Sequence, residues 1–381
     1  MTRSRARTDE AADDPIRLLR HPGPIAPYPA EPSNEDLAAA VGVSPDEIVR
    51  MDMNTLGGGP LPAVAAATAM PGGDALEYGD LAYARLRSAL SALTGVPPKQ
   101  IIPGAGADEL IRLVTMLTAG PGAPVVVPVP TFPMFAVEAR LAGAEVVEVP
   151  RERADLRQPV ERIRAVGEAA GARLVWLCTP NNPTGDAYSL DEVRRLVAGL
   201  PALVVVDEVY VEFAEASSGA PSGSLSAAAL IDDHPNLLVL RSLSKAYGLA
   251  GARVGYLVAG PALAQRLDAS RLPLAIGAPS EALALAAVGD PAGARRRHEE
   301  LVAERGRIAT TLSGFGWELL PSVTNFLTFR PPNGPALARA LHRRGLIVRL
   351  YDSGLLAGWL RVTVRSAAEN DRFLAALADL S

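Results

Sequence analysis

SLSKAYGLAGARVGY, residues 242–256, lies between two apolar, strand-like runs and contains one of the two lysines of this chain. The other is Lys99, so arginine supplies nearly all of the 37 Lys and Arg residues. Arginine cannot replace Lys245 where a free amine is needed, because a guanidinium stays protonated. A desolvated lysine can lose its proton near neutral pH and form a Schiff base. A GC-rich genome would explain why lysine is scarce, but not why one remains here, so we interpret position 245 as one that needs an amine.

Length and composition narrow the class of protein. At about 150 residues per domain, a chain of 381 residues predicts two domains or one large one. The net charge of −5 argues against general affinity for nucleic acids. The four histidines lack the spacing of metal ligands, and no apolar run is long enough to span a membrane, so we expect neither a metal site nor a membrane span. One cysteine, Cys178, excludes an internal disulfide framework and favours a reducing, cytoplasmic location.

The order of elements predicts an α/β fold. From about residue 100, helical and strand-like segments alternate, which is typical of βαβ units with a mostly parallel sheet and helices on both faces. The expected strands are residues 123–130, 144–150, 173–179, 202–208, 236–242 and 252–259, and the expected helices are residues 108–120, 133–143, 159–171 and 190–200.

After about residue 265 the pattern becomes that of a smaller α+β module. A long charged helix is expected over 293–314, with short strands near 317–319, 325–329, 346–349 and 360–364 and helices near 335–344 and 369–380. We therefore expect a large domain over 51–265 and a small domain over 266–381, with segment 15–50 associated with the small domain. Residues 1–14 are charged and lack the apolar region of a secretory signal, so we expect a disordered arm there.

Polar residues follow several of the predicted strands, where ligands bind in α/β sheets. Asp207, in VVVDEVY, ends a buried strand, and a carboxylate there is costly unless a cation faces it. That cation is either part of a ligand or an arginine in an internal salt bridge, and Asp207 alone does not decide between them. Asn182, in CTPNNPTG, and Tyr210 also follow strands, but each taken singly is explained as well by a turn or by the core.

A second group of residues suits a phosphate. Ser242, Ser244 and Arg253 offer two hydroxyls and a guanidinium close to Lys245 in the sequence. GAGAD, residues 104–108, precedes a predicted helix, whose N-terminus presents free N–H groups to an anion. A Gly-x-Gly before a helix is more often only a turn, so this motif is weak by itself.

Taken together, the motifs resemble those of class I/II aminotransferases of fold type I, which use pyridoxal 5′-phosphate (PLP). The resemblance runs from about Tyr28 to the C-terminus and is greatest to the subfamily of histidinol-phosphate aminotransferases. It implies a mostly parallel large-domain sheet flanked by helices, plus a smaller α+β domain. The phrases that carry it are GAGADELI, PTFPMF, TPNNPTG, VVVDEVYVEF, RSLSKAYGLAGARVGY, GLIVR and LRVTV followed by ENDRFLAAL.

The resemblance also implies roles in holding PLP. Lys245 is expected to bind the cofactor covalently and to shuttle the proton, and Asp207 to pair with the pyridine nitrogen. Asn182 and Tyr210 are expected to hydrogen-bond the ring oxygen, and Phe132 to stack on the ring, where the family often has Tyr. The expected ligands of the cofactor phosphate are the N–H groups of Ala107 and Asp108 and the side chains of Ser242, Ser244 and Arg253.

For the substrate, the resemblance implies a ping-pong transfer of an amino group from histidinol phosphate to 2-oxoglutarate, in histidine biosynthesis. Arg361 and Arg349 are expected to hold the anionic group of the amino donor, because a dianion suits two guanidinium forks. Tyr78, in LEYGD, resembles a tyrosine that reaches the site of the neighbouring subunit, which implies a homodimer. The remaining expected substrate-binding residues are Tyr28, Asn54 and Asn182.

Three departures from the subfamily pattern surround the substrate and not PLP. MDMNTLGGGP (51–60) keeps Asn54 but has Thr-Leu-Gly in place of Glu-Asn-Pro, Arg365 stands where glycine is common, and RLPLAIGAP (271–279) lacks a Pro-Tyr-Asn. They leave open an aminotransferase of aromatic or secondary-metabolite amino acids, or an enzyme similar to phosphothreonine decarboxylase. A non-enzymatic PLP-sensing regulator is disfavoured, because no helix-turn-helix pattern precedes the fold.

Overall fold

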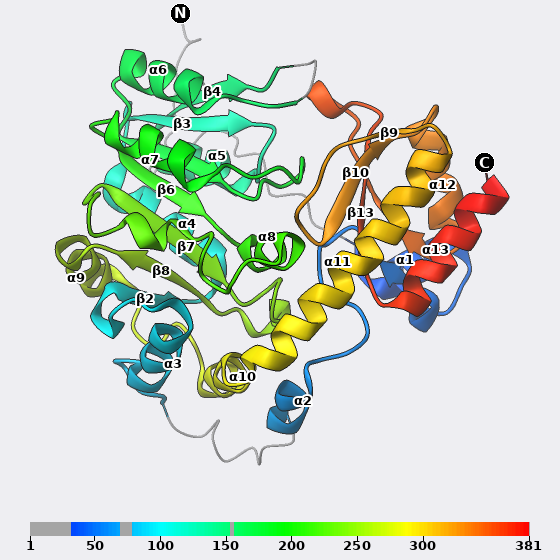
Figure 1. The fold of residues 1–381 in the computed structure, drawn as a ribbon, viewed down its shortest axis with the longest axis horizontal. Helices are drawn as coiled ribbons and strands as arrows, with labels where there is room; N and C mark the ends of the chain where they lie inside the picture. The colour runs from blue at the N-terminus through cyan, green and yellow to red at the C-terminus, as the bar shows by residue number, and fades with distance from the viewer. Residues whose placement is uncertain (1–31, 69–77, 153–155, 381) are drawn as a thin grey trace, which may run out of the picture.

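The structure is a computed structural model that describes residues 32–68, 78–152 and 156–380, and it contains two large β-sheets (Figure 1). In the seven-stranded sheet, β8 is antiparallel to both of its neighbours and all other pairs are parallel. The predicted α/β class with a mostly parallel sheet is therefore confirmed. In spatial order the strands are β2 (Ile101–Gly104), β8 (Gly255–Ala259), β7 (Leu237–Ser242), β6 (Leu203–Asp207), β5 (Leu174–Cys178), β3 (Pro124–Val129) and β4 (Glu145–Pro150).

Side chains alternate along the central strands, so each strand contributes to two apolar layers. In β5, Leu174 and Trp176 pack in one layer, whereas Val175 and Leu177 pack in the other. Because both faces of the sheet are covered, these strands are continuous apolar runs in the sequence. The layer of Trp176 is completed by α4 (Gly106–Thr118), α5 (Met134–Leu141) and α9 (Pro261–Ser270), and the opposite layer by α6 (Val160–Ala170), α7 (Leu190–Ala198) and α8 (Val211–Ser218).

The smaller sheet is antiparallel and is built from the C-terminal part of the chain. Its order is β12 (Arg349–Leu350), β13 (Leu360–Thr363), β10 (Phe326–Arg330) and β9 (Glu318–Leu319). Helices α12 (Gly334–His342) and α13 (Ala367–Leu380) pack beside it (Figure 1). A separate parallel pair joins β1 (Val49–Arg50), which follows α1 (Asn34–Val41), to β11 (Leu346–Ile347).

The long helix α11 (Pro291–Gly314) connects the two parts of the fold. It contacts α8 and α10 (Ala278–Val288) on the side of the large sheet, and α13, β9 and β10 on the side of the small one (Figure 1). Its start is set by Asp290, whose carboxylate accepts a hydrogen bond from the N–H of Gly293 at 2.9 Å. Pro291 follows at the first helical position, where no N–H is needed.

Some expected elements differ from the structure. The expected strand over 346–349 is wrong: it is two strands, β11 and β12, which belong to different sheets. The expected strand over 252–259 begins only at Gly255, because a turn of 3₁₀-helix and the left-handed backbone of Arg253, with φ of 54°, precede it. The sequence analysis also did not find β2, α10 or α3 (Ala84–Thr94).

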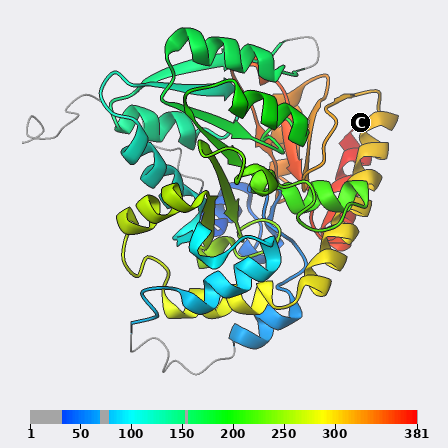
Figure 2. The ribbon, with the colours of Figure 1, turned by 60° about the vertical axis from the view of Figure 1, so that its left-hand side comes forward.

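The domain boundary near residue 265 stays a prediction, and the contacts of the next two helices bear on it. α9 packs against β2 and β8, and α10 packs against α3 and α2 (Pro62–Thr68) (Figure 2). Both helices therefore lie with the large sheet. We propose that the chain passes from the large body to the small one along α11. The expected arm over 1–14 lies outside the described residues.

Gly255→Ala tests the close approach of β8 to the start of α4. A Cβ at Gly255 would lie 2.9 Å from the carbonyl carbon of Gly106 and 3.1 Å from the nitrogen of Ala107. We expect the variant to lose about 2 kcal/mol of unfolding free energy, measured by urea denaturation, because backbone must move. Gly251→Ala is the matched control, since a Cβ there meets no heavy atom within 4 Å. Equal stability of the two variants would contradict the close approach.

Candidate active site

A cavity of about 500 Å³ is lined by the ends of the parallel strands, the start of α4 and the small sheet. Of the predicted site residues, Tyr28 falls outside the part of the chain that the structure describes. Tyr78 lies before α3, is 89% exposed, and does not line the cavity. All the others line it: Asn54, Ala107, Asp108, Phe132, Asn182, Asp207, Tyr210, Ser242, Ser244, Lys245, Arg253, Arg349 and Arg361.

At the ends of the two central strands β6 and β7, successive side chains alternate between the two faces of the sheet. The two strands pair in parallel with Asp207 opposite Leu240. Because side chains alternate along a strand, Asp207 and Ser242 lie on the face of Leu240, which is the face that α4 covers. Glu208 and Arg241 lie on the other face. The residues expected to bind a ligand are therefore brought to the start of α4.

Asp207 is a buried acid without a cationic partner among the described residues. It is 3% exposed, and its Oδ1 accepts a hydrogen bond from the N–H of Val209 at 3.0 Å. Burial raises the pKa of Asp207 to about 7, and the carboxylates of Asp108 and Glu208 add to the rise. The salt bridge to arginine, which the sequence left as an alternative, is not formed within the described residues. The carboxylate is thus available to a cation that a ligand supplies.

Lys245 brings its amine into the same cavity. It follows a turn in which the N–H of Ser244 donates to the hydroxyl of Ser242 at 3.2 Å, and its Nζ donates to the carbonyl of Met53 at 2.7 Å. Burial lowers the pKa of Lys245 to about 8, and the positive charge of Arg361 contributes. A pKa near 8 leaves roughly a tenth of such amines neutral at pH 7, against fewer than about one in a thousand for an ordinary lysine. Lys245 can therefore act as a nucleophile.

Hydrogen-bond donors cluster at the start of α4. The first N–H groups of this helix have no partner within it. The hydroxyls of Ser242 and Ser244 lie 3.0 Å apart, and Arg253 pairs with Asp108 at 2.9 Å. Gly106, with φ of 82°, lies beneath the guanidinium: a Cβ there would come within 2.7 Å of Nη2 of Arg253. Such a set of N–H groups, hydroxyls and a guanidinium is suited to a phosphate.

Tyr210 and Phe132 add a hydroxyl and an aromatic ring to the cavity wall. The hydroxyl of Tyr210 accepts a hydrogen bond from the side-chain amide of Asn54 at 2.9 Å. Burial raises the pKa of Tyr210, so its hydroxyl keeps its proton and can donate to a ligand. Phe132 is half-buried and meets Phe135 edge to face, with ring centroids 5.7 Å apart.

The small sheet contributes two arginines to the cavity. Arg349 and Arg361 are direct partners across β12 and β13, so their side chains lie next to each other on one face. Arg361 donates to the side-chain oxygen of Asn182 and to the carbonyl of Asp52. Its Nε is buried and has no hydrogen-bond partner among the described residues. An anionic ligand would satisfy this group and would separate two like charges.

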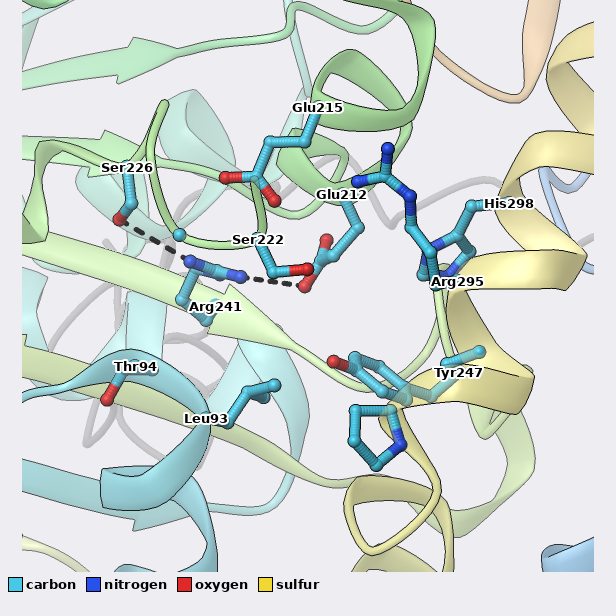
Figure 3. Close-up of a pocket in the computed structure, with 13 residues that line it drawn as sticks. Leu93, Thr94, Glu212, Glu215, Ser222, Ser226, Arg241, Tyr247, Arg295 and His298 are labelled. Atoms are coloured by element: carbon cyan, nitrogen blue, oxygen red, sulfur yellow. Dashed lines mark hydrogen bonds and ion pairs between the residues drawn. The ribbon is translucent and has the colours of Figure 1, made fainter. Parts of the chain in front are cut away.

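A cluster of carboxylates surrounds Arg241 on the other face of β6 and β7 (Figure 3). The guanidinium pairs with Glu208 at 3.3 Å and with Glu212, in the first turn of α8, at 2.7 Å. Glu215 lines the same small cavity, and burial raises the pKa of Glu215 to about 7. Because Glu208 adjoins Asp207, the cluster fixes the strand ends that carry the site. The sequence analysis missed it, although Glu212 and Glu215, spaced three residues apart on α8, were a signal.

The structure also adds cavity residues that carried no signal of their own in the sequence, among them Met53 and Tyr351, and it places Thr55, from the loop that departs from the subfamily pattern, in the cavity wall. Within the described ranges, no group of three or more His, Cys, Asp or Glu side chains is arranged to hold a metal ion. None of the described helices is long and apolar enough to cross a membrane.

Comparison with known proteins decides the family. The family model for aminotransferase class I and II matches residues 46–377. The chain belongs to this family. The histidinol-phosphate aminotransferase of Roseiflexus castenholzii is 35% identical over 368 residues, which cover 94% of this chain and 96% of that protein. The aromatic amino acid aminotransferase of Mycobacteroides abscessus is 33% identical over 357 residues, covering 92% and 96%.

A solved structure supports the cofactor of this aminotransferase. Histidinol-phosphate aminotransferase from Sinorhizobium meliloti, in complex with PLP, superposes with a TM-score of 0.82 at 30% identity, covering 92% of this chain and 96% of that one. The predicted family, fold, enzyme class and cofactor are confirmed: the protein is a PLP-dependent aminotransferase. It acts on an amino donor and a 2-oxo acid. The residues present fit the cofactor, because an unpaired carboxylate, a nucleophilic amine and a phosphate-binding cluster line one cavity.

Asp207→Asn should stabilise the aminotransferase when it lacks PLP. The pKa of Asp207 is raised from 3.8 to about 7 by folding, so ionisation opposes folding. The loss of stability caused by ionisation is absent below the pKa of the unfolded state, 3.8. It grows as the pH rises from there and reaches its full size above the pKa of the folded state, about 7. At pH 8 the variant apoprotein should therefore be more stable than wild type by about 2 kcal/mol or more in urea denaturation, a difference that shrinks towards pH 5.

Adding PLP should reverse this order, because the cofactor offers a cation to the carboxylate of wild type and not to the amide. Asp232→Asn, at an exposed acid, is the matched control and should behave as wild type at both pH values. A stability difference that does not depend on pH would show that ionisation of Asp207 is not its cause.

Proposed function

We propose that this enzyme transfers the amino group of histidinol phosphate to 2-oxoglutarate, a step of histidine biosynthesis, by a ping-pong mechanism. The observation that carries the proposal is the cross-strand pairing of Arg349 with Arg361 at the cavity wall. A phosphate dianion bound at this pair would offset the repulsion between like charges that lie directly opposite on two strands. A phosphate dianion matches two guanidinium groups in charge and in geometry. Histidinol-phosphate aminotransferases among the relatives of the chain support the same substrate.

The residues around the cofactor take roles that follow from their chemistry. When bound, PLP supplies an electron sink that weakens the bonds at the α-carbon of the amino donor. Lys245 holds the cofactor through its amine, and takes and returns the proton at that carbon. Asp207 would pair with the pyridine nitrogen and keep it protonated, because two unit charges in contact attract by roughly 5 kcal/mol at an effective dielectric of 20, before desolvation. Tyr210 and Asn182 would hydrogen-bond the ring oxygen, and Phe132 would cover the ring.

The start of α4 holds the cofactor phosphate. The N–H groups of Ala107 and Asp108 and the hydroxyls of Ser242 and Ser244 would donate to the phosphate oxygens. Arg253, which pairs with Asp108 at 2.9 Å, supplies the countercharge. Asn54 supports Tyr210 through their hydrogen bond of 2.9 Å and would contact the substrate from the cavity wall.

We further propose that the enzyme is a cytoplasmic homodimer. The large apolar side chains that are exposed among the described residues include Tyr78 at 89%, Leu81 at 58% and Leu272 at 61%. Arg271 donates to the carbonyl of Leu81, so the segments of the two leucines adjoin. A patch of this kind marks an interface, from which Tyr78 would reach the cavity of the partner and contact its substrate. The single cysteine, Cys178, is buried, which fits a reducing compartment.

A second candidate is an aminotransferase of aromatic amino acids. The relative from Mycobacteroides abscessus, named for that activity, is 33% identical over almost the whole chain. Thr55 lines the cavity where the histidinol-phosphate subfamily has glutamate, which changes the substrate side of the wall. In such an enzyme Arg361 would bind the carboxylate of the amino acid.

Lys245→Ala tests the assignment of the reactive amine. Without this amine the protein cannot hold PLP covalently, so the visible absorbance of the bound cofactor should vanish and turnover should fall by roughly a thousandfold or more. Lys99→Ala removes the only other lysine of the chain, which is exposed and does not line the cavity, and should leave both readouts unchanged. Unaltered kinetics in Lys245→Ala would defeat the assignment.

The donor is tested by supplying 2-oxoglutarate with histidinol phosphate, phenylalanine or phosphothreonine, and by measuring glutamate and carbon dioxide. We expect glutamate from histidinol phosphate. Arg349→Gln should raise the KM for this donor by about 10- to 100-fold, because a charge-assisted bond to phosphate is lost. Arg330→Gln, at an exposed arginine of the same sheet, is the control. Glutamate from phenylalanine alone selects the second candidate, and carbon dioxide from phosphothreonine would indicate a decarboxylase.

A further inference from the structure

The loop of residues 52–59 borders the cavity, and side chains from later parts of the chain hold its backbone carbonyls. The carbonyls of its first three residues accept hydrogen bonds from Arg361, Lys245 and Asn325 in turn. The carbonyls of its last two residues both accept from Arg297 of α11, at 3.3 and 3.1 Å. The loop therefore has little conformational freedom, although its sequence is rich in glycine.

Arg365 holds the middle of this loop. Its Nη1 donates to the carbonyls of Thr55 and Leu56, each at 3.3 Å, and to the hydroxyl oxygen of Thr55 at 3.1 Å. The guanidinium is itself fixed, because its Nε and Nη2 donate to Oε1 of Glu369 at 3.1 and 2.7 Å. Glu369 lies in the first turn of α13 and accepts the N–H of Ser366 at 3.1 Å through its other oxygen. Arg365 thus ties the loop to the start of a helix.

The loop fits closely against this helix start. Gly57 is buried there, and a Cβ at this position would lie 2.7 Å from the nitrogen of Ser366. Glycine at 57 therefore permits the approach that brings the neighbouring carbonyls within reach of Arg365. The unusual residues on the loop and on the segment after β13 form one contact and not two separate changes.

Thr55 connects the contact between Arg365 and the loop to the cavity in which the substrate would bind. Thr55 lines the cavity, whereas Arg365 does not. Because the hydroxyl oxygen of Thr55 accepts a hydrogen from Arg365, its own O–H remains to donate elsewhere. We propose that Arg365 is a positioning residue that holds the Thr55 hydroxyl towards a hydrogen-bond acceptor in the side chain of the amino donor, and so sets donor preference. This inference rests on the proposed function of the cavity.

Arg365→Gln in the PLP-loaded enzyme tests the inference. The KM for histidinol phosphate, whose side chain carries acceptors, should rise about tenfold, while the KM for phenylalanine, whose side chain carries none, should change less than about twofold. The absorbance of the bound cofactor should not change. Hydrogen exchange of peptides covering residues 52–59 should become faster, which shows directly that the loop has been released. Arg307→Gln removes another arginine that contacts α13 but not the loop, and is the matched control.

A double-variant cycle separates positioning from general support. If Arg365 acts through Thr55, the losses of affinity for histidinol phosphate should not add. The double variant of Arg365→Gln with Thr55→Val should then bind this donor no more weakly than the single variant that binds it more weakly. Additive losses, equal effects on both donors, or unchanged exchange of the loop would each overturn the inference. If wild type transaminates neither donor, the proposed function fails. The inference would then be decided by two measurements: binding of histidinol phosphate, monitored through the absorbance of the cofactor, and hydrogen exchange of residues 52–59. Absence of binding would overturn it.

Discussion

The register between β6 and β7 determines where the whole site stands. With Asp207 opposite Leu240, alternation turns one set of strand-end residues towards α4 and the next set towards α8. A slip of one residue would exchange the two sets and place Glu208 in the cavity. Arg241 opposes such a slip, because its guanidinium forms ion pairs with Glu208 at 3.3 Å and with Glu212 at 2.7 Å on the face towards α8. A buried ion pair on one face of the sheet thus holds the chemistry on the other.

Burial shifts the pKa values of the Asp207 carboxyl and the Lys245 amine towards each other. It raises the pKa of Asp207 to about 7 and lowers the pKa of Lys245 to about 8. In the protein without cofactor, each of the two groups is therefore close to losing its charge near neutral pH. Arg361 contributes to the lowering at Lys245, and the same guanidinium belongs to the substrate end of the cavity. Substrate charge and amine reactivity are consequently linked through one side chain.

All the residues expected at the cofactor line the cavity, whereas of those expected at the substrate Tyr78 does not line it and Tyr28 lies outside the described residues. Asp207 ends an apolar strand and Lys245 follows another, and the ends of such strands are easy to predict from the sequence. Ligands bind at the strand ends of an α/β sheet, so these two positions were predicted to lie at a site. The contact of Arg365 with Thr55 joins residues 310 positions apart, and no periodicity connects them. β2 was missed because four residues containing a proline give almost no strand signal. Two strands were merged near Val348 because each has only two residues.

The order in which the cavity wall is assembled follows from the distances along the chain that its bonds span. Asp52 meets Arg361, and the backbone of Asn54 meets Thr363, each 309 positions later. A ribosome must therefore release nearly the entire polypeptide before these bonds can form. The large sheet can begin to assemble earlier, since its strands lie closer together in sequence. The cavity wall is therefore completed late, and a product terminated before Arg361 and Thr363 would lack the bonds that close it.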